Sequence, residues 1–233
     1  MKPALLVEDM TYRWPGAKGF ELAVDRVEIA QFESVLLLGG SGSGKSTLLS
    51  LICGIIQADK GKICVNSTDV GQLAAARRDR FRADNIGVIF QQFNLLPNVT
   101  PLDNVLLPLH FAPARKARLS QPPRETALSL LDQLGLPRDA MTSDTASQLS
   151  VGQQQRVAVA RALIGQPPLI IADEPTSALD EASQTLFLDL LFKQVGAAGS
   201  TLLMVSHDAR LGERFDRQIS LETISTTNRK GNA

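Results

Sequence analysis

Residues 35–52, VLLLGGSGSGKSTLLSLI, decide the fold of this chain. A short apolar run leads into a loop of glycine and serine, and a leucine-rich stretch follows from Lys45. An apolar run of this length is typical of a strand buried in a parallel sheet, and the stretch after the loop is typical of a helix. The segment therefore predicts a strand, a loop and a helix in that order.

The loop fits the pattern G-x-x-x-x-G-K-[ST] between a strand and a helix, which is the context that gives the pattern its chemistry. Glycines let backbone amides crowd around phosphate oxygens, the Lys45 ammonium reaches the terminal phosphates, and the Ser46 hydroxyl can hold a magnesium ion. A flexible linker would need neither the Lys-Ser pair nor the preceding strand. The predicted phosphate-binding residues are Gly39, Gly40, Ser41, Gly42, Ser43, Gly44, Lys45, Ser46 and Thr47.

The rest of the chain predicts an α/β core. Apolar runs like the first recur at 86–90, 169–173 and 201–207, whereas the opening 30 residues and GKICVN at 61–66 alternate as half-buried antiparallel strands would. Residues 98–147 are helical in pattern, with ETALSLLDQLGL ended by Gly135 and Pro137. We therefore expect an α/β core with a β-rich edge and a helical insert at about 98–160.

Composition excludes several classes of function. The chain has 24 basic and 24 acidic residues, so no net field attracts nucleic acid or an anionic membrane. No apolar run approaches the roughly 18 residues of a membrane span. Cys53 and Cys64 lack metal or redox spacing, which favours buried free thiols and a cytosolic protein. Residues 1–233 are expected to form one domain with a polar tail at about 224–233.

Two acids follow the strand predicted at 169–173. In a phosphate-loop protein the first, Asp173, holds the metal ion, usually through water, and the second, Glu174, is placed to polarise the attacking water. An isolated pair of acids here would be ordinary charge at a helix start. With the glycine-rich loop elsewhere in the chain, we predict Glu174 as the general base.

The stretch LSVGQQQR at 149–156 predicts a helix that begins at about Val151. Ser150 and Gln153 form a capping-box pattern, and no acid complements the positive end of the helix dipole. The helix start is therefore left free for an outside anion.

Together, GGSGSGKST, LSVGQQQRVAVARAL, LIIADEPTSALD and VSHD resemble, in order and spacing, the ATP-binding cassette of ABC transporters over about residues 5–221. The resemblance implies a P-loop NTPase fold with a mixed RecA-like core, an antiparallel β-subdomain and an α-helical subdomain. It also implies ATP and Mg²⁺ as ligands.

The resemblance assigns further roles. Tyr12 stacks on adenine, with Trp14 as a rival; Gln91 senses magnesium and the membrane partner; and His207 contacts the γ-phosphate. Asp180 communicates between two nucleotide sites. Gln91 thereby joins Ser46 and Asp173 in the expected metal site.

Ser150, Gly152 and Gln153 resemble the signature loop, which binds the γ-phosphate of ATP held by a second copy. The family usually has LSGGQ, so Val151 replaces a glycine, and we expect ordinary helical angles there at little cost. Phe32 stands where the family often has a turn glycine.

The stretch IGVIFQQFNLLPNVTPLDNVLLPLHFA resembles the subgroup of lipoprotein-release, macrolide-efflux and cell-division ATPases. This implies an ATP-dependent homodimer on the inner face of the cytoplasmic membrane, bound to integral-membrane subunits with large extracytoplasmic domains. The candidates for contact with the membrane subunits are Phe93, Leu95, Leu96 and Val99. An ATPase subunit of an amino-acid or metal importer is the alternative; a kinase, a DNA-repair ATPase and a two-cassette translation factor fit less well.

Overall fold

A computed structural model describes residues 2–15, 20–177 and 179–229. The chain divides into two compact units, which are described separately. Unit 1 comprises residues 1–82 and 201–233, and unit 2 comprises residues 83–200.

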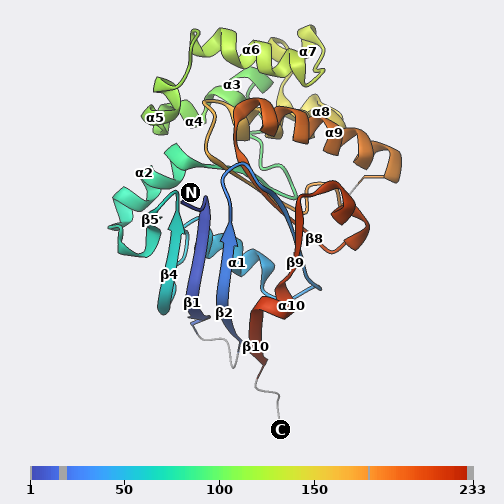
Figure 1. The fold of residues 1–233 in the computed structure, drawn as a ribbon. Coiled ribbons are helices and arrows are strands. Elements are labelled where there is room, and N and C mark those ends of the chain that lie inside the picture. Colours follow the sequence, from blue (N-terminus) through green and yellow to red (C-terminus); the bar gives the residue numbers. More distant parts are fainter. Residues whose placement is uncertain (1, 16–19, 178, 230–233) are drawn as a thin grey trace. The chain divides into compact units, whose positions relative to one another are not determined.

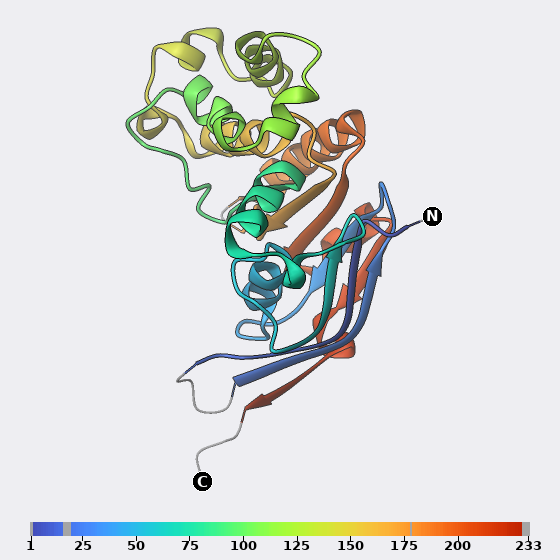
Figure 2. The same cartoon turned by 90° about the vertical axis from the view of Figure 1, so that its left-hand side faces the viewer.

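Unit 1 contains an antiparallel sheet in the order β10-β2-β1-β4-β5. Figure 2 shows β1 and β2 as long neighbouring ribbons, in dark blue and blue. The side chains of β1 alternate between buried and less buried positions, which confirms the half-buried strands predicted for the opening residues. The strands are β1 (Leu5–Arg13), β2 (Phe20–Ile29), β4 (Lys60–Val65), β5 (Thr68–Asp69) and β10 (Ser225–Arg229).

Strand β10 lies within the polar tail predicted from about residue 224. Its backbone pairs with β2, with Thr226 opposite Ala23. The hydrogen bonds offered by the edge of β2 give this polar segment a regular structure that hydrophobic patterning could not reveal. Residues 230–233 lie outside the described residues.

The phosphate loop lies in a second part of unit 1. Strand β3 (Ser34–Leu38) runs parallel to β8 (Thr201–Ser206) and to β9 (Arg217–Ser220). It leads into helix α1 (Lys45–Ile52), which packs against β4 (Figure 1). The predicted order of strand, loop and helix is therefore confirmed. The other elements of unit 1 are η1 (Val70–Gln72), η3 (Ala209–Arg214), α10 (Leu221–Ile224) and most of α2 (Ala75–Asn85).

Unit 2 combines two parallel strands with a group of helices. Strand β6 (Ile86–Ile89) pairs with β7 (Leu169–Asp173), as two of the apolar runs predicted. Helix α8 (Val151–Leu163) packs against β6, α3 and α9 (Figure 1). The remaining helices are α3 (Pro101–Leu106), α4 (Pro108–Phe111), α5 (Pro113–Ala117), α6 (Pro123–Gln133), α7 (Arg138–Thr142), η2 (Ala146–Gln148) and α9 (Glu181–Ala198).

Cys53 and Cys64 are both buried and neither forms a disulfide, as their spacing predicted. Burial raises the pKa of the Cys64 thiol above its ordinary value. Among the described residues, no helix combines the length and the apolar character that a membrane span requires.

Candidate nucleotide site

The phosphate loop in unit 1 wraps around its own lysine. The Lys45 ammonium donates to the carbonyl oxygens of Gly39 at 2.7 Å and of Gly40 at 2.9 Å, and the residue is only 7% exposed. Gly42 and Gly44 have φ angles of 74° and 105°, which a residue with a side chain adopts only with strain. Helix α1 has no acid in its first turn, so its positive end faces the loop without a competing carboxylate.

An exposed tryptophan stands beside this loop. The Trp14 indole N–H donates to the Thr47 hydroxyl at 3.1 Å, and Trp14 is 39% exposed. Tyr12 is only 7% exposed, and its ring meets that of Trp14 edge to face with centroids 5.5 Å apart. Trp14 is therefore the more accessible of the two rings predicted as candidates for stacking on a base, and Tyr12 packs against it from within the core.

His207 follows β8 in unit 1 and is exposed. Its neighbour Asp208 accepts from the backbone N–H of Arg210 at 3.0 Å and forms an ion pair with the Arg210 guanidinium. The hydrogen bond from Arg210 is the largest cause that lowers the pKa of Asp208, so this carboxylate stays charged at neutral pH.

The two predicted acids lie at the end of β7 in unit 2. Asp173 is the last residue of the strand, and the half-buried Glu174 has a left-handed φ of 44°. Such a strained angle in a residue other than glycine is typical of functional sites. The buried Gln155 of α8 donates to the carbonyl of Pro175 at 2.8 Å and so fixes the turn after Glu174.

Two more predicted residues lie near this turn. The exposed Gln91 donates its side-chain amide to the Ser177 hydroxyl at 3.3 Å, which brings the segment after β6 beside the turn that follows β7. Asp180 caps α9 by accepting from the backbone N–H of Ser183 at 2.8 Å. That bond is the main cause that lowers the pKa of Asp180.

Helix α8 begins at Val151, and its capping box is present as predicted. The Ser150 hydroxyl accepts from the backbone N–H of Gln153 at 3.3 Å, while the Gln153 side chain accepts from the backbone N–H of Ser150 at 2.8 Å. The hydroxyl proton of Ser150 is not used by this box. The first turn carries no acid, and apart from the adjacent residues and the backbone of α8 itself, no described atom lies within 4 Å of where a Cβ on Gly152 would stand.

Val151 adopts ordinary helical angles. It is the first residue of α8, does not have a positive φ, and is 53% exposed. The expectation that valine fits this backbone position is therefore confirmed.

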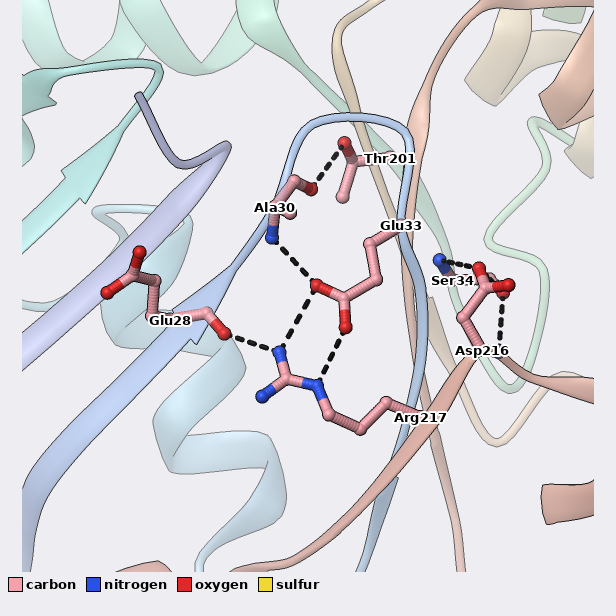
Figure 3. Close-up of polar contacts among 7 residues, drawn as sticks. All are labelled: Glu28, Ala30, Glu33, Ser34, Thr201, Asp216 and Arg217. Carbon is pink, nitrogen blue, oxygen red and sulfur yellow. Dashed lines mark hydrogen bonds and ion pairs between the residues drawn. The ribbon is translucent and has the colours of Figure 1, made fainter. Parts of the chain in front are cut away.

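Phe32 behaves differently, because it has a left-handed φ of 66° and is 69% exposed. Polar contacts fix its turn: the Thr201 hydroxyl accepts from the backbone N–H of Phe32 at 2.8 Å, and the Glu33 carboxylate accepts from the backbone N–H of Ala30 at 2.7 Å. Arg217 pairs with Glu33 at 2.7 Å, and Asp216 accepts from Ser34 (Figure 3). The turn holds the angle that a glycine would adopt without strain.

Sequence reasoning missed Arg161, which joins α8 to the segment after Gln91. Its guanidinium donates to the carbonyls of Phe93 and of Asn94, two residues with positive φ, and burial lowers the pKa of Arg161. Phe93 is 8% exposed, so it belongs to the core, whereas its neighbour Leu96 is 45% exposed. Arginine on the apolar side of a predicted helix was the available signal.

A glycine-rich loop that wraps its lysine between a parallel strand and a helix defines a P-loop nucleotide-binding protein. The ABC transporter family model matches residues 23–177. The lipoprotein-releasing system ATP-binding protein LolD of Legionella pneumophila is 38% identical over 91% of this chain and 89% of that protein. The ABC transporter ATP-binding protein MJ0796 of Methanocaldococcus jannaschii is 41% identical over 81% of each.

Among solved structures, a dimeric post-hydrolysis state of the MJ0796 cassette bound to ADP and Pi superposes with a TM-score of 0.76 and 34% identity, over 93% of each chain. The chain therefore belongs to the ABC transporter family. It is an ATP-binding subunit of a transporter, and its activity is the hydrolysis of ATP.

Proposed function

We propose that two copies of the chain close around two ATP molecules, and that closure drives a conformational change in integral-membrane subunits. The observation that carries this proposal is the start of α8, where Ser150 and Gly152 form an acid-free helix N-terminus with open space beside the glycine. Such an end attracts phosphate. The signature loop of each copy would bind the γ-phosphate of the ATP that is held by the phosphate loop of the other copy.

Binding of ATP is assigned mainly to unit 1. The amides of residues 39–46 would surround the β- and γ-phosphates, and Lys45 would exchange its carbonyl partners for phosphate oxygens. Trp14 would stack on adenine in place of Tyr12. His207 would contact the γ-phosphate.

The donors proposed for magnesium fit that ion, since the Ser46 hydroxyl, the Asp173 carboxylate and the Gln91 amide all offer oxygen. No group of three or more His, Cys, Asp or Glu among the described residues could hold a metal ion. Magnesium needs no such group, because it is commonly held by few protein ligands together with phosphates and water. When bound, it neutralises charge on the phosphates.

Hydrolysis is assigned to Glu174. Its carboxylate would accept a proton from the water that attacks the γ-phosphorus, while Lys45 and the signature serine stabilise the negative charge on the phosphoryl oxygens. Asp180 caps α9 and follows Glu174 closely in the sequence. It would communicate between the two nucleotide sites.

Light scattering coupled to size exclusion tests the dimer. Glu174→Gln keeps the shape of the side chain but removes the base, so a dimer should accumulate with MgATP and not without it. The double variant Lys45→Ala/Glu174→Gln should stay monomeric. A Glu174→Gln protein that remains monomeric with MgATP, or one that hydrolyses ATP like the wild type, would contradict these assignments.

The finer assignment is a mechanical role like that of lipoprotein-release and macrolide-efflux ATPases. The 38% identity to LolD supports it. The chain would then sit on the cytoplasmic face of the membrane, and exposed Leu96 would contact the membrane subunit.

Purification of tagged protein from detergent-solubilised native membranes tests this role. Co-purified subunits with few spans and a large extracytoplasmic domain are expected. A polytopic permease in their place would favour an importer, and the absence of any membrane subunit would contradict both assignments.

A further inference from the structure

A pocket of about 240 Å³ lies inside unit 2. It is formed by the segment after α5, one side of α6 and the C-terminal ends of α8 and α9. None of the residues assigned to ATP binding or hydrolysis lines it. The ATPase function therefore leaves this pocket unexplained.

Gln194 of α9 lines the pocket and is only 5% exposed. Its side-chain amide forms no hydrogen bond to another described residue, and its polar atoms are not fully enclosed, so they face the pocket. On the same helix, the half-buried Gln184 donates to the Thr176 hydroxyl at 3.2 Å. An amide that has no protein partner and opens into a pocket can pair with a polar group of a ligand.

Arg118 gives the pocket a positive charge. Its Nη1 atom donates to the carbonyls of Asp84 at 3.1 Å and of Gly165 and Gln166 at 3.3 Å, which fixes the guanidinium in place. None of these three bonds uses the Nε–Nη2 edge, which is the edge that binds a carboxylate through two parallel hydrogen bonds. No Asp or Glu is among the described residues that line the pocket.

The remaining walls suit a small amphipathic molecule. Leu130, Leu163 and Ile164 supply an apolar surface for a short aliphatic chain. Gln166 has a left-handed φ of 49°, and such strain in a residue other than glycine is often found at ligand sites. The volume lies below the roughly 300–1,000 Å³ of pockets for drug-sized ligands, which favours a small ligand.

We propose that this pocket binds a small carboxylic acid of amino-acid size that carries a second polar group. The carboxylate pairs with Arg118, the aliphatic part packs on Leu130 and Leu163, and an amide or hydroxyl pairs with Gln194. The site is separate from ATP binding, and it can be tested by binding alone.

Ligand-observed NMR titration of the full chain tests the proposal with L-glutamine, L-serine and succinate as probes. L-Glutaminamide, which lacks the carboxylate, is the matched probe. Glutamine should bind and glutaminamide should bind at least about tenfold more weakly, because the paired carboxylate is lost. Gln194→Met and Arg118→Gln should each weaken the binding of glutamine about tenfold or more. Gln184→Met, outside the pocket, should bind like the wild type.

A second readout separates a ligand-binding amide from a structural one. Without probes, Gln194→Met should keep or raise the thermal midpoint, because its amide has no hydrogen bond to another described residue to lose, whereas Gln184→Met should lower it by removing the bond to Thr176. Failure of every probe to bind would overturn the proposal. Wild-type binding by both Gln194→Met and Arg118→Gln would also overturn it, as would a lowered midpoint for Gln194→Met.

Discussion

Phe32 and Val151 both occupy positions where the resemblance to the ABC family leads one to expect glycine, often in the first case and usually in the second, but their backbones differ. Phe32 has a φ of 66° in the turn before β3, while Val151 adopts helical angles at the start of α8. Both side chains are more than half exposed, so crowding does not distinguish them. The difference teaches that the cost of replacing a family glycine depends on the φ angle that the position requires.

The glycines that the chain retains show the same contrast. Gly44 has a φ of 105°, and an added Cβ would meet the side chains of Leu22 at 3.2 Å and Phe20 at 3.3 Å. Gly152 lies within α8 and has open space around it. Gly44 is therefore required by its own chain, whereas the open space at Gly152 gives no such internal requirement and fits the proposed approach of a phosphate.

Gly44→Ala should have the largest effect. Alanine would have to adopt a left-handed angle and push aside two side chains, so the free energy of unfolding should fall by about 2 kcal/mol. Distortion of the loop amides should also weaken the binding of ATP about tenfold or more. Thermal denaturation and calorimetric titration measure both. Unchanged stability and affinity would show that the loop relaxes without cost.

Phe32→Gly should stabilise the protein by about 1 kcal/mol, because glycine removes the strain of a left-handed phenylalanine. Phe32→Ala is the matched control: it also removes the ring but keeps the Cβ, so it should bring no gain. Denaturant unfolding measures both. Equal stability of the two variants would show that φ does not set the cost at this turn.

Local pattern predicted much of the fold and part of the candidate site. The apolar runs predicted β3, β6, β7 and β8, and the capping box placed the start of α8, because neighbouring residues determine both features. Strand β10, the exposure of Trp14 beside the phosphate loop and the contact of Arg161 with Phe93 were not predicted. Each depends on contacts between residues far apart in the sequence.

Gly152→Ala should separate stability from function. Alanine is the better helix former by about 0.5–1 kcal/mol and meets no atom here, so the free energy of unfolding should rise. The added methyl group should nevertheless hinder the approach of a phosphate, so Gly152→Ala/Glu174→Gln should form less dimer with MgATP than Glu174→Gln alone. Light scattering and denaturant unfolding measure the two effects. A full yield of dimer would argue against a ligand at this glycine.

Val151→Gly should have the smallest effect, since the helical angles of Val151 suit either residue. Glycine in the first turn of a helix loses more backbone entropy than valine, so the free energy of unfolding should fall by less than about 0.5 kcal/mol. In the Glu174→Gln background, the ATP-dependent dimer should form to the same extent with valine or glycine. A dimer that appears only with Val151→Gly would show that the exposed isopropyl group obstructs closure. The contrast with Phe32 would then rest on side-chain bulk at the signature loop rather than on φ alone.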